Sequence, residues 1–418
     1  MQTRLADTFL DTKLGKEADA ILRACVHCGF CNATCPTYQL LGDELDGPRG
    51  RIYLIKQVLE GHAPTRKTQR HLDRCLTCRA CETTCPSGVR YGRLADIGRA
   101  LVEQAVDRPL GERLARRLLR LIVPHAGRFG LLLALGQAVR PLLPSGLRRR
   151  VPPRRTAGPW PDHPHARNML VLAGCAQSAA APDINAAAAR VLDRLGVRLI
   201  TAPQAGCCGA LSHHLSAEDE ARAQMRRNID TWWPHLEAGA EAIVVTASGC
   251  GAMVKDYGQL LADDPTYAAK AARVSELVRD LVEVLAGEDL DRLGANGAGR
   301  RVAFHAPCTL QHAQKLAGRV EALLARLGFE LTPVRDAHLC CGSAGSFSLL
   351  QPALARRLRD DKLASLEAGG PEFIATANIG CLLHLESGSQ FPVRHWIELV
   401  DGAMRGEARG NRYHAMSH

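Results

Sequence analysis

Two cysteine motifs in the first quarter of the chain constrain its fold more than any other feature. The first motif is Cys25-Val-His-Cys28-Gly-Phe-Cys31-Asn-Ala-Thr-Cys35-Pro36. The second is Cys75-Leu-Thr-Cys78-Arg-Ala-Cys81-Glu-Thr-Thr-Cys85-Pro86. Both follow the spacing C-x2-C-x2-C-x3-C-P, in which the first three cysteines wrap a tight turn around three corners of a cubane cluster. The proline prevents this turn from continuing, so the fourth thiolate points away from its own loop.

The fourth cysteine of each motif decides how the ligands are shared. In chains with two such motifs it ligates the other cluster. The first predicted [4Fe–4S] cluster therefore has the ligands Cys25, Cys28, Cys31 and Cys85. The second has the ligands Cys75, Cys78, Cys81 and Cys35. Zinc fits less well because zinc sites pair C-x2-C units and have no use for a third cysteine at that spacing, and disulfides need an oxidising compartment.

Composition narrows the class of protein. A chain of 418 residues with 16 cysteines is too long for one core, and we expect two or three domains in a reducing cytoplasm. Residues 1–20 carry charges throughout and lack the apolar centre of a signal peptide. The longest apolar run, near residues 129–139, is too short to cross a bilayer, although the chain can lie against one.

The formal net charge of +10 points to an acidic protein partner or anionic lipid rather than to nucleic acid. The arginines are not interleaved with aromatic residues, and no nucleic-acid-binding motif is present. Two of these arginines, Arg49 and Arg51, lie between the cysteine motifs. Either one of them lies near a cluster and favours its reduced state, or both are solvated residues of a helix start.

The composition divides the chain into four parts. Residues 1–100 form the predicted domain with the two clusters, and residues 101–165 form a basic helical linker. In the linker an apolar stripe is flanked by arginines, namely Leu114, Leu118, Leu119, Leu121 and Ile122 beside Arg113, Arg116, Arg117 and Arg120. This pattern is typical either of a helix at a membrane surface or of a helix that packs on the next domain with its basic face in water.

The remaining parts, residues 166–290 and 295–410, are two copies of one α/β unit. Each carries C-x31-C-C and a later cysteine, and Arg194-Leu-Gly196 in the first copy matches Arg326-Leu-Gly328 in the second. The four cysteines of each copy are Cys175, Cys207, Cys208 and Cys250, then Cys308, Cys340, Cys341 and Cys381. Each cysteine group follows a predicted strand, so parallel pairing brings the four sulfurs of a copy to one sheet edge.

Four cysteines are enough to ligate one more cluster, and we expect at least one copy to hold an iron–sulfur cluster. The second copy is favoured because Thr309, His305 and His338 place polar groups beside its sulfurs. Sharp turns at Gly209 and Gly342 would aim adjacent thiols inward. The alternative is a close-packed pocket of reduced thiols.

With both patterns present, the chain resembles the iron–sulfur subunits of bacterial glycolate oxidase over nearly its whole length. The segments that carry the resemblance are Arg23-Ala-Cys-Val-His-Cys-Gly-Phe-Cys31, Pro36-Thr-Tyr-Gln-Leu-Leu-Gly-Asp-Glu-Leu-Asp-Gly-Pro-Arg-Gly-Arg-Ile-Tyr53 and Thr246-Ala-Ser-Gly-Cys-Gly251. The resemblance implies an electron-transfer subunit, inactive alone and without catalytic residues. Two flavin-binding-type partner subunits would oxidise glycolate to glyoxylate, and a quinone or another acceptor would receive the electrons at the inner face of the membrane.

Other functions remain open at this point. The same domain combination occurs in subunits of glycerol-3-phosphate and lactate dehydrogenase complexes and in heterodisulfide reductases. The reductases carry a closing C-x-x-C, whereas the partner positions here are Ala247 or Met253 around Cys250 and Asn378 or His384 around Cys381. A purely structural zinc scaffold is the third alternative. The chain shows no G-x-G-x-x-G dinucleotide loop after a strand, which agrees with a role without hydride transfer.

Overall fold

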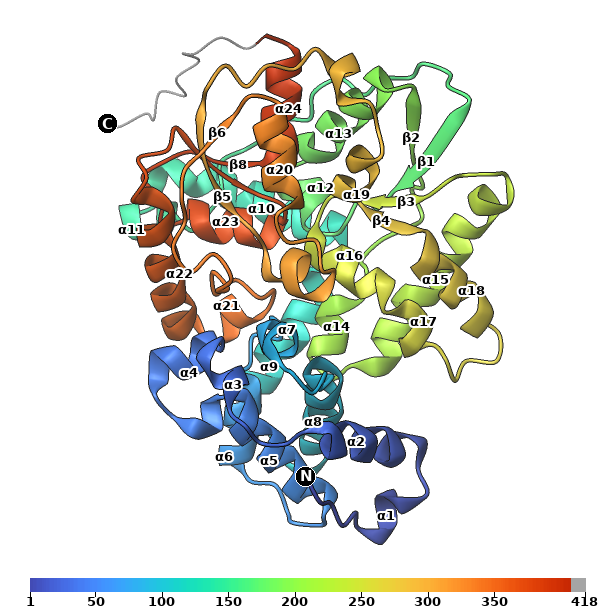
Figure 1. Ribbon diagram of the computed structural model, residues 1–418, viewed down its shortest axis with the longest axis vertical. Helices are drawn as coiled ribbons and strands as arrows, with labels where there is room; N and C mark the ends of the chain where they lie inside the picture. The colour runs from blue at the N-terminus through green and yellow to red at the C-terminus, as the bar shows by residue number, and fades with distance from the viewer. Residues whose placement is uncertain (407–418) are drawn as a thin grey trace.

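The computed structural model describes residues 1–406, which form a helical N-terminal part and two α/β units (Figure 1). The N-terminal part lies at one end of the molecule and the two sheets lie toward the other end. The predicted fold class, a helical cluster-binding domain followed by two α/β repeats, is confirmed. Residues 407–410 of the predicted second repeat lie outside the described residues.

Short helices build the N-terminal part around the two cysteine motifs. These elements are α1 (Asp7–Leu10), α2 (Lys13–Ala24), α3 (Phe30–Ala33), α4 (Pro36–Leu41), the 3₁₀ turn η1 (Glu44–Asp46), α5 (Pro48–Leu59), α6 (Arg66–Asp73), α7 (Ala80–Thr84) and α8 (Tyr91–Ala105). Leu22, Ile55 and Leu94 are fully buried in one core that joins α2, α5 and α8. The side chains of this core recur at helical spacing along each helix, which is why the three helices pack together.

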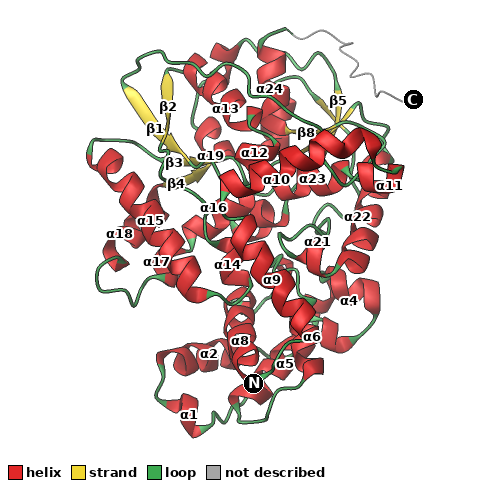
Figure 2. Ribbon diagram, turned by 180° about the vertical axis from the view of Figure 1, so that it is seen from behind, coloured by secondary structure: helices red, strands yellow, loops and turns green. Residues whose placement is uncertain are grey.

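The linker helices turn their leucines to solvent. They are α9 (Leu110–Ile122), α10 (Ala126–Val139), η2 (Arg140–Leu142) and α11 (Ser145–Arg148), and Figure 2 shows α9 and α10 across the near face. Leu114 is 58% exposed, whereas Arg116 and Arg120 form ion pairs of 2.9 Å with Asp73 and Glu220. The expectation of a helix with its arginines in water is therefore wrong for these two arginines, because acidic groups of α6 and α15 hold them.

No single described helix is long and apolar enough to span a membrane. Residues 110–122 and 126–142 pass such a test of length and composition only as a pair, and this pair is bent by 105°.

Each α/β unit contains a four-stranded, fully parallel sheet. The first has the order β2-β1-β3-β4, with β1 (Arg167–Val171), β2 (Val197–Thr201), β3 (Ile243–Val245) and β4 (Val278–Asp280). The second has the order β6-β5-β7-β8, with β5 (Arg301–His305), β6 (Glu330–Leu331), β7 (Phe373–Thr376) and β8 (Val393–His395). The identical order confirms the repeat, and all strands of a sheet end at one edge.

Helices cover both sheets. Those of the first unit are α12 (Gln177–Ala180), α13 (Asp183–Arg194), α14 (Ala210–His214), α15 (Glu218–Glu237), α16 (Ser248–Lys255), α17 (Tyr257–Leu260), α18 (Ala268–Leu277), α19 (Leu281–Ala286) and η3 (Leu290–Leu293). Those of the second are η4 (Thr309–Ala313), α20 (Arg319–Arg326), α21 (Phe347–Leu350), α22 (Pro352–Glu367), α23 (Ile379–Glu386) and α24 (Trp396–Met404). The units meet at the carboxyl ends of β3 and β7, where Ser248 N–H donates to the Ala377 carbonyl at 3.0 Å.

Candidate iron–sulfur centres

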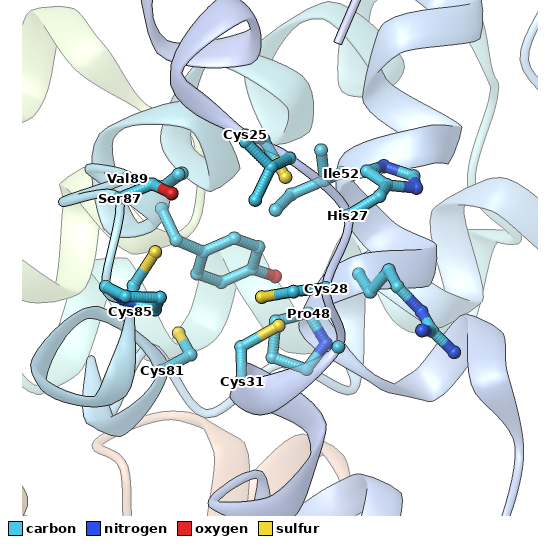
Figure 3. Close-up of a pocket in the computed structure, with 15 residues that line it drawn as sticks. Cys25, His27, Cys28, Cys31, Pro48, Ile52, Cys81, Cys85, Ser87 and Val89 are labelled. Carbon is cyan, nitrogen blue, oxygen red and sulfur yellow. The ribbon is translucent and has the colours of Figure 1, made fainter.

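The first cavity gathers thiols from both cysteine motifs. Cys25, Cys28, Cys31 and Cys85 line it together with Tyr91. Figure 3 shows the sulfur atoms of these four cysteines turned toward the same space. Cys85 reaches the cavity from the second motif, as the crossed ligand assignment requires, although that assignment stays a prediction.

A second cavity lies beside the first. Its lining contains Cys35, Cys75, Cys78 and Cys81. Cys35 comes from the first motif and is buried there, so each cavity contains cysteines of both motifs. Cys81 and Tyr91 line both cavities and form part of the wall between them. With Cys81 counted as a ligand in the second cavity, each cavity offers four thiols, which fits two [4Fe–4S] clusters in adjacent positions.

Left-handed backbone conformations shape both cysteine loops. His27 and Gly29 in the first motif have φ of 58° and 86°, and Thr77 and Arg79 at the matching positions of the second have φ of 53° and 59°. These turns bring successive thiols of a loop toward one point. Only one of the four positions is a glycine, so three of the four left-handed turns could not be predicted from glycine positions in the sequence. At Gly29 a Cβ would also lie 2.6 Å from the Arg49 side chain.

A buried arginine supplies positive charge beside the second cavity. Arg51 is 1% exposed; its Nε donates to the His71 carbonyl at 2.7 Å and its Nη2 to Thr37 Oγ1 at 3.2 Å. Its Nη1 lies 4.0 Å from Cys35 Sγ. Arg51 therefore takes the position near a cluster, which resolves the two alternatives for this residue.

The charge of Arg51 is balanced within the same core. The carboxylate of Asp46 is fully buried, 3.5 Å from Arg51 Nη2 and 2.7 Å from Arg74 Nη1. Burial raises the pKa of the Cys75 thiol, but the charges of Arg51 and Arg99 outweigh it and leave that pKa below its usual value. Tyr91 also donates to Cys75 Sγ at 3.5 Å. This surrounding favours thiolate at Cys75, the form that binds iron.

The first cavity carries less positive charge. Arg49 lines it but pairs with Glu44 at 2.6 Å, and both side chains are partly exposed. Burial raises the pKa of Cys31 to about 11, and neighbouring cysteines add to the shift. Cys28 is exposed to solvent. The two cavities thus offer the same ligands in different electrostatic environments.

In the first repeat, the four cysteines lie near enough to affect one another's pKa values. The thiols of Cys175 and Cys208 lower the pKa of Cys207 well below its usual value, and Cys207 and Cys250 raise the pKa of Cys208. Gly209 precedes α14 with φ of 91°, the sharp turn expected after the paired cysteines.

The second repeat places its sulfurs against the second cavity. Cys308 Sγ lies 3.8 Å from Cys340 Sγ, and both pack in one apolar cluster with Leu76 and Cys78. Gly342 has φ of 85°, as expected. Thr309, which we expected to lie beside these sulfurs and to hydrogen-bond to them, has its hydroxyl group 2.8 Å from Ser248 Oγ and is hydrogen-bonded to it. The further cluster predicted for this repeat stays a prediction.

The position of the missing fifth cysteine is occupied by an amide. Asn378 Nδ2 donates to Cys381 Sγ at 3.5 Å. Asn378 Oδ1 accepts from the N–H of Gly249 in the other repeat at 3.2 Å. The Asn378 amide therefore links Cys381 of the second repeat to Gly249 of the first.

An ionic contact joins the N-terminal part to the first repeat. His213 Nε2 of α14 lies 3.3 Å from Asp96 of α8, and its Nδ1 lies 3.2 Å from Glu218. Burial alone would lower the pKa of His213, but Asp96 and Glu218 raise it from 6.5 to about 10. His214 also lies near Asp96, 3.9 Å from its carboxylate. Protonated His213 therefore stabilises the contact at neutral pH.

This contact predicts a pH-dependent stability. Because the folded pKa is the raised one, the stabilisation is complete below about pH 6.5 and is lost as pH rises through about 10. We expect His213→Gln to lower the thermal midpoint of the anaerobic holoprotein near pH 6.5, with a difference from wild type that disappears above pH 10. A constant difference across this range would contradict the assignment, and His235→Gln, on α15, is the matched control.

Comparisons with known proteins agree with this geometry. The 4Fe-4S dicluster domain family matches residues 21–89, and the Cysteine-rich domain family matches residues 169–255 and 302–386. The chain is 60% identical over 408 residues to the glycolate oxidase iron-sulfur subunit of Escherichia coli (strain K12), across 97% of this chain and 100% of the relative. It is 31% identical to the probable glycolate oxidase iron-sulfur subunit of Bacillus subtilis (strain 168), across 87% and 88%. Lactate utilization protein A of Geobacillus kaustophilus (strain HTA426) is 30% identical across 52% of this chain and 92% of its own length.

Proposed function

Since the chain belongs to the glycolate oxidase iron–sulfur subunit family, we propose that it takes electrons from flavin-binding partner subunits that oxidise glycolate to glyoxylate. It is an electron-transfer subunit of an oxidoreductase. The acceptor we propose is a quinone or another carrier reached at the inner face of the cytoplasmic membrane. We assign no catalytic residue to this chain, so in this proposal the partner subunits carry out the oxidation of glycolate.

The observation that carries this proposal is the pair of adjacent cavities that share Cys81 and Tyr91. A flavin releases two electrons, and two [4Fe–4S] clusters accept them singly. The residues we assign to the first cluster are Cys25, Cys28, Cys31 and Cys85. Those we assign to the second are Cys75, Cys78, Cys81 and Cys35. Arg51 and Arg99 hold positive charge at the second cavity, where negative charge accumulates on reduction.

The division of the chain follows the same logic. We propose residues 1–100 as the cluster domain, 101–165 as the linker, and 166–290 and 295–410 as the two cysteine-rich domains. The buried contact of Cys308 and Cys340 with Leu76 and Cys78 supports a role of the repeats as a wall for the second cavity.

Glycolate alone should not reduce the isolated chain, because the two clusters we propose accept single electrons and not a hydride. We expect the visible absorption of the anaerobic, purified chain to stay unchanged with glycolate and to bleach when both flavin subunits are added. Dithionite is the control that shows the clusters of the isolated chain are reducible. Glycolate-dependent bleaching of the chain by itself would contradict the proposal, and a parallel series with lactate tests the substrate range suggested by the lactate utilization relatives.

The linker helices support a membrane-surface role. Leu110 and Leu142 are 79% and 85% exposed, and they lie with Leu114, Leu118 and Leu131 in a set of exposed apolar residues on α9, α10 and η2. Exposed arginines lie in the same segment, among them Arg113 and Arg117. An apolar face with a basic border suits the headgroup region of an anionic bilayer. We propose that this face rests on the inner leaflet.

Changing Leu110, Leu114 and Leu118 to Asn should reduce binding of the complex to phosphatidylglycerol vesicles at both low and high salt, by at least about tenfold. Arg113→Gln with Arg117→Gln should weaken binding about thirtyfold at low salt only, since each charge is worth about 1 kcal/mol and salt screens it. Arg116 and Arg120 are left unchanged because they form the ion pairs with Asp73 and Glu220. Unchanged cosedimentation of the leucine variant would reject the membrane contact.

A further inference from the structure

His305, the last residue of β5, is buried without any hydrogen-bond partner. It is 1% exposed, and neither its Nδ1 nor its Nε2 is bonded. Other buried histidines of the same repeat are satisfied: His312 Nε2 lies 2.9 Å from the His338 carbonyl, and His395 Nε2 lies 2.9 Å from the Thr246 carbonyl. An unsatisfied imidazole in a protein interior is costly and calls for a bound partner.

Two thiols lie next to this imidazole. A ring nitrogen of His305 and the sulfurs of Cys341 and Cys381 all lie within 4.8 Å of one another, and all three residues are buried. They come from the end of β5, the turn at Gly342 and the first turn of α23. Cys340 precedes Cys341 in the chain, but its sulfur lies outside this group of mutually close ligand atoms.

The spacing of these atoms decides between an ion and a cluster. Tetrahedral zinc binds sulfur at about 2.3 Å and nitrogen at about 2.0 Å, which puts its ligand atoms roughly 3.3–3.8 Å apart. A cubane spreads its thiolates further, since each binds a different iron. Among the residues that the structure describes, none of the groups that meet the 4.8 Å limit contains a cysteine of the two ferredoxin-type motifs. The set around His305 is therefore tighter than the cluster cavities.

We propose that His305, Cys341 and Cys381 bind a single Zn²⁺ ion, whose fourth position is taken by a ligand that this group does not supply. The two thiolates balance the charge of Zn²⁺, and the buried Lys362 lies where its positive charge stabilises the Cys341 thiolate. Its Nζ donates to the Asp336 carbonyl at 2.7 Å, which holds it in the interior.

The first repeat provides an internal comparison. Leu172 precedes Cys175 by three residues, as His305 precedes Cys308, so leucine takes the place of the imidazole there. Because this imidazole is absent from the first repeat, we assign the ion to the second repeat alone. This assignment is independent of the proposed electron-transfer route.

The test is metal analysis of the full chain, purified anaerobically and washed with a chelator. We expect about one zinc and about eight iron atoms per chain. His305→Leu, which installs the residue of the first repeat, should remove the zinc and leave the iron unchanged. His305→Cys should keep it, and X-ray absorption at the zinc edge should change from one nitrogen and two sulfurs as protein ligands to three sulfurs. His384→Leu, which removes a half-buried imidazole bonded to the Ala355 carbonyl, is the control that keeps zinc.

Two results would overturn the proposal. One is a wild-type chain without zinc, and the other is zinc that persists in His305→Leu. About twelve iron atoms that fall to about eight in Cys341→Ser would identify a third cluster in place of the ion. Well below eight iron atoms per chain in the wild type would instead contradict the assignment of two clusters. The zinc content does not test that assignment.

Discussion

Cys35→Ala should remove the cluster of the second motif, although Cys35 belongs to the first. Its thiol lines the cavity of Cys75, Cys78 and Cys81 and lies 4.0 Å from Arg51 Nη1. We expect iron to fall from about eight to about four per chain, since the buried site cannot recruit water easily as a fourth ligand. Metal analysis and the magnetic-resonance spectrum of the reduced chain measure this loss.

Cys85→Ala is the matched control, because Cys85 crosses in the opposite direction and lines the first cavity. It should leave the second cluster in place. The surviving cluster is identified by adding Arg51→Met to each cysteine variant. This change should shift the potential of the cluster that remains in Cys85→Ala, because that cluster is the one beside Arg51. If the cluster that survives Cys35→Ala shifts instead, the crossed assignment is wrong.

Arg51→Met should lower the reduction potential of the second cluster by about 100 mV. Reduction adds negative charge, and the buried guanidinium of Arg51 stabilises it. At an effective dielectric constant of about 20, a unit charge roughly 7 Å away is worth about 2.4 kcal/mol, or about 100 mV for one electron. Potentiometric titration monitored by magnetic resonance measures the shift, and the first cluster should move much less.

The same change should destabilise the fold by about 3 kcal/mol, because Asp46 loses one of its buried partners. Arg74 still pairs with Asp46, so the loss in the free energy of unfolding stays at the low end of the range typical of a broken buried ion pair. The double variant Arg51→Met with Asp46→Asn removes the buried charge on both sides, so it should recover most of the stability. Its potential should rise above that of Arg51→Met, because the negative charge of Asp46 is removed as well. A potential that is unchanged in Arg51→Met despite the lost stability would show that Arg51 acts only through the fold.

Much of the fold could be predicted because strands and cysteine groups alternate regularly. Strands predicted ahead of the cysteine groups are confirmed, among them β2, β5 and β7. The strands β4 and β8 were missed, since three residues at a sheet edge leave almost no periodic signal. The role of Arg51 could not be separated from that of Arg49, because only the packed helix α5 shows which side chain turns inward.

The orientation of α9 needed tertiary information. Its apolar stripe predicts an amphipathic helix, but the pattern does not contain Asp73 or Glu220, which hold Arg116 and Arg120 from distant segments. The position of Cys35 and Cys85, each in the cavity of the other motif, could be predicted from the C-x2-C-x2-C-x3-C-P spacing that occurs twice in the chain. His305 was singled out only as a polar neighbour of sulfur, since no sequence pattern reveals an unsatisfied imidazole.

We also expect the loop from Cys75 to Cys85 to couple the insertion of the second cluster to the folding of the chain. Arg79 of this loop pairs with Asp256 in the first repeat at 2.7 Å, and Thr83 bonds to His312 in the second at 3.1 Å. A newly made chain that has not yet received iron lacks the group that holds this loop in shape, so both anchors should form late. Such chains should be cut by proteases at the loop, whereas loaded chains resist. Cluster insertion would then act as a checkpoint that lets only filled subunits join the complex.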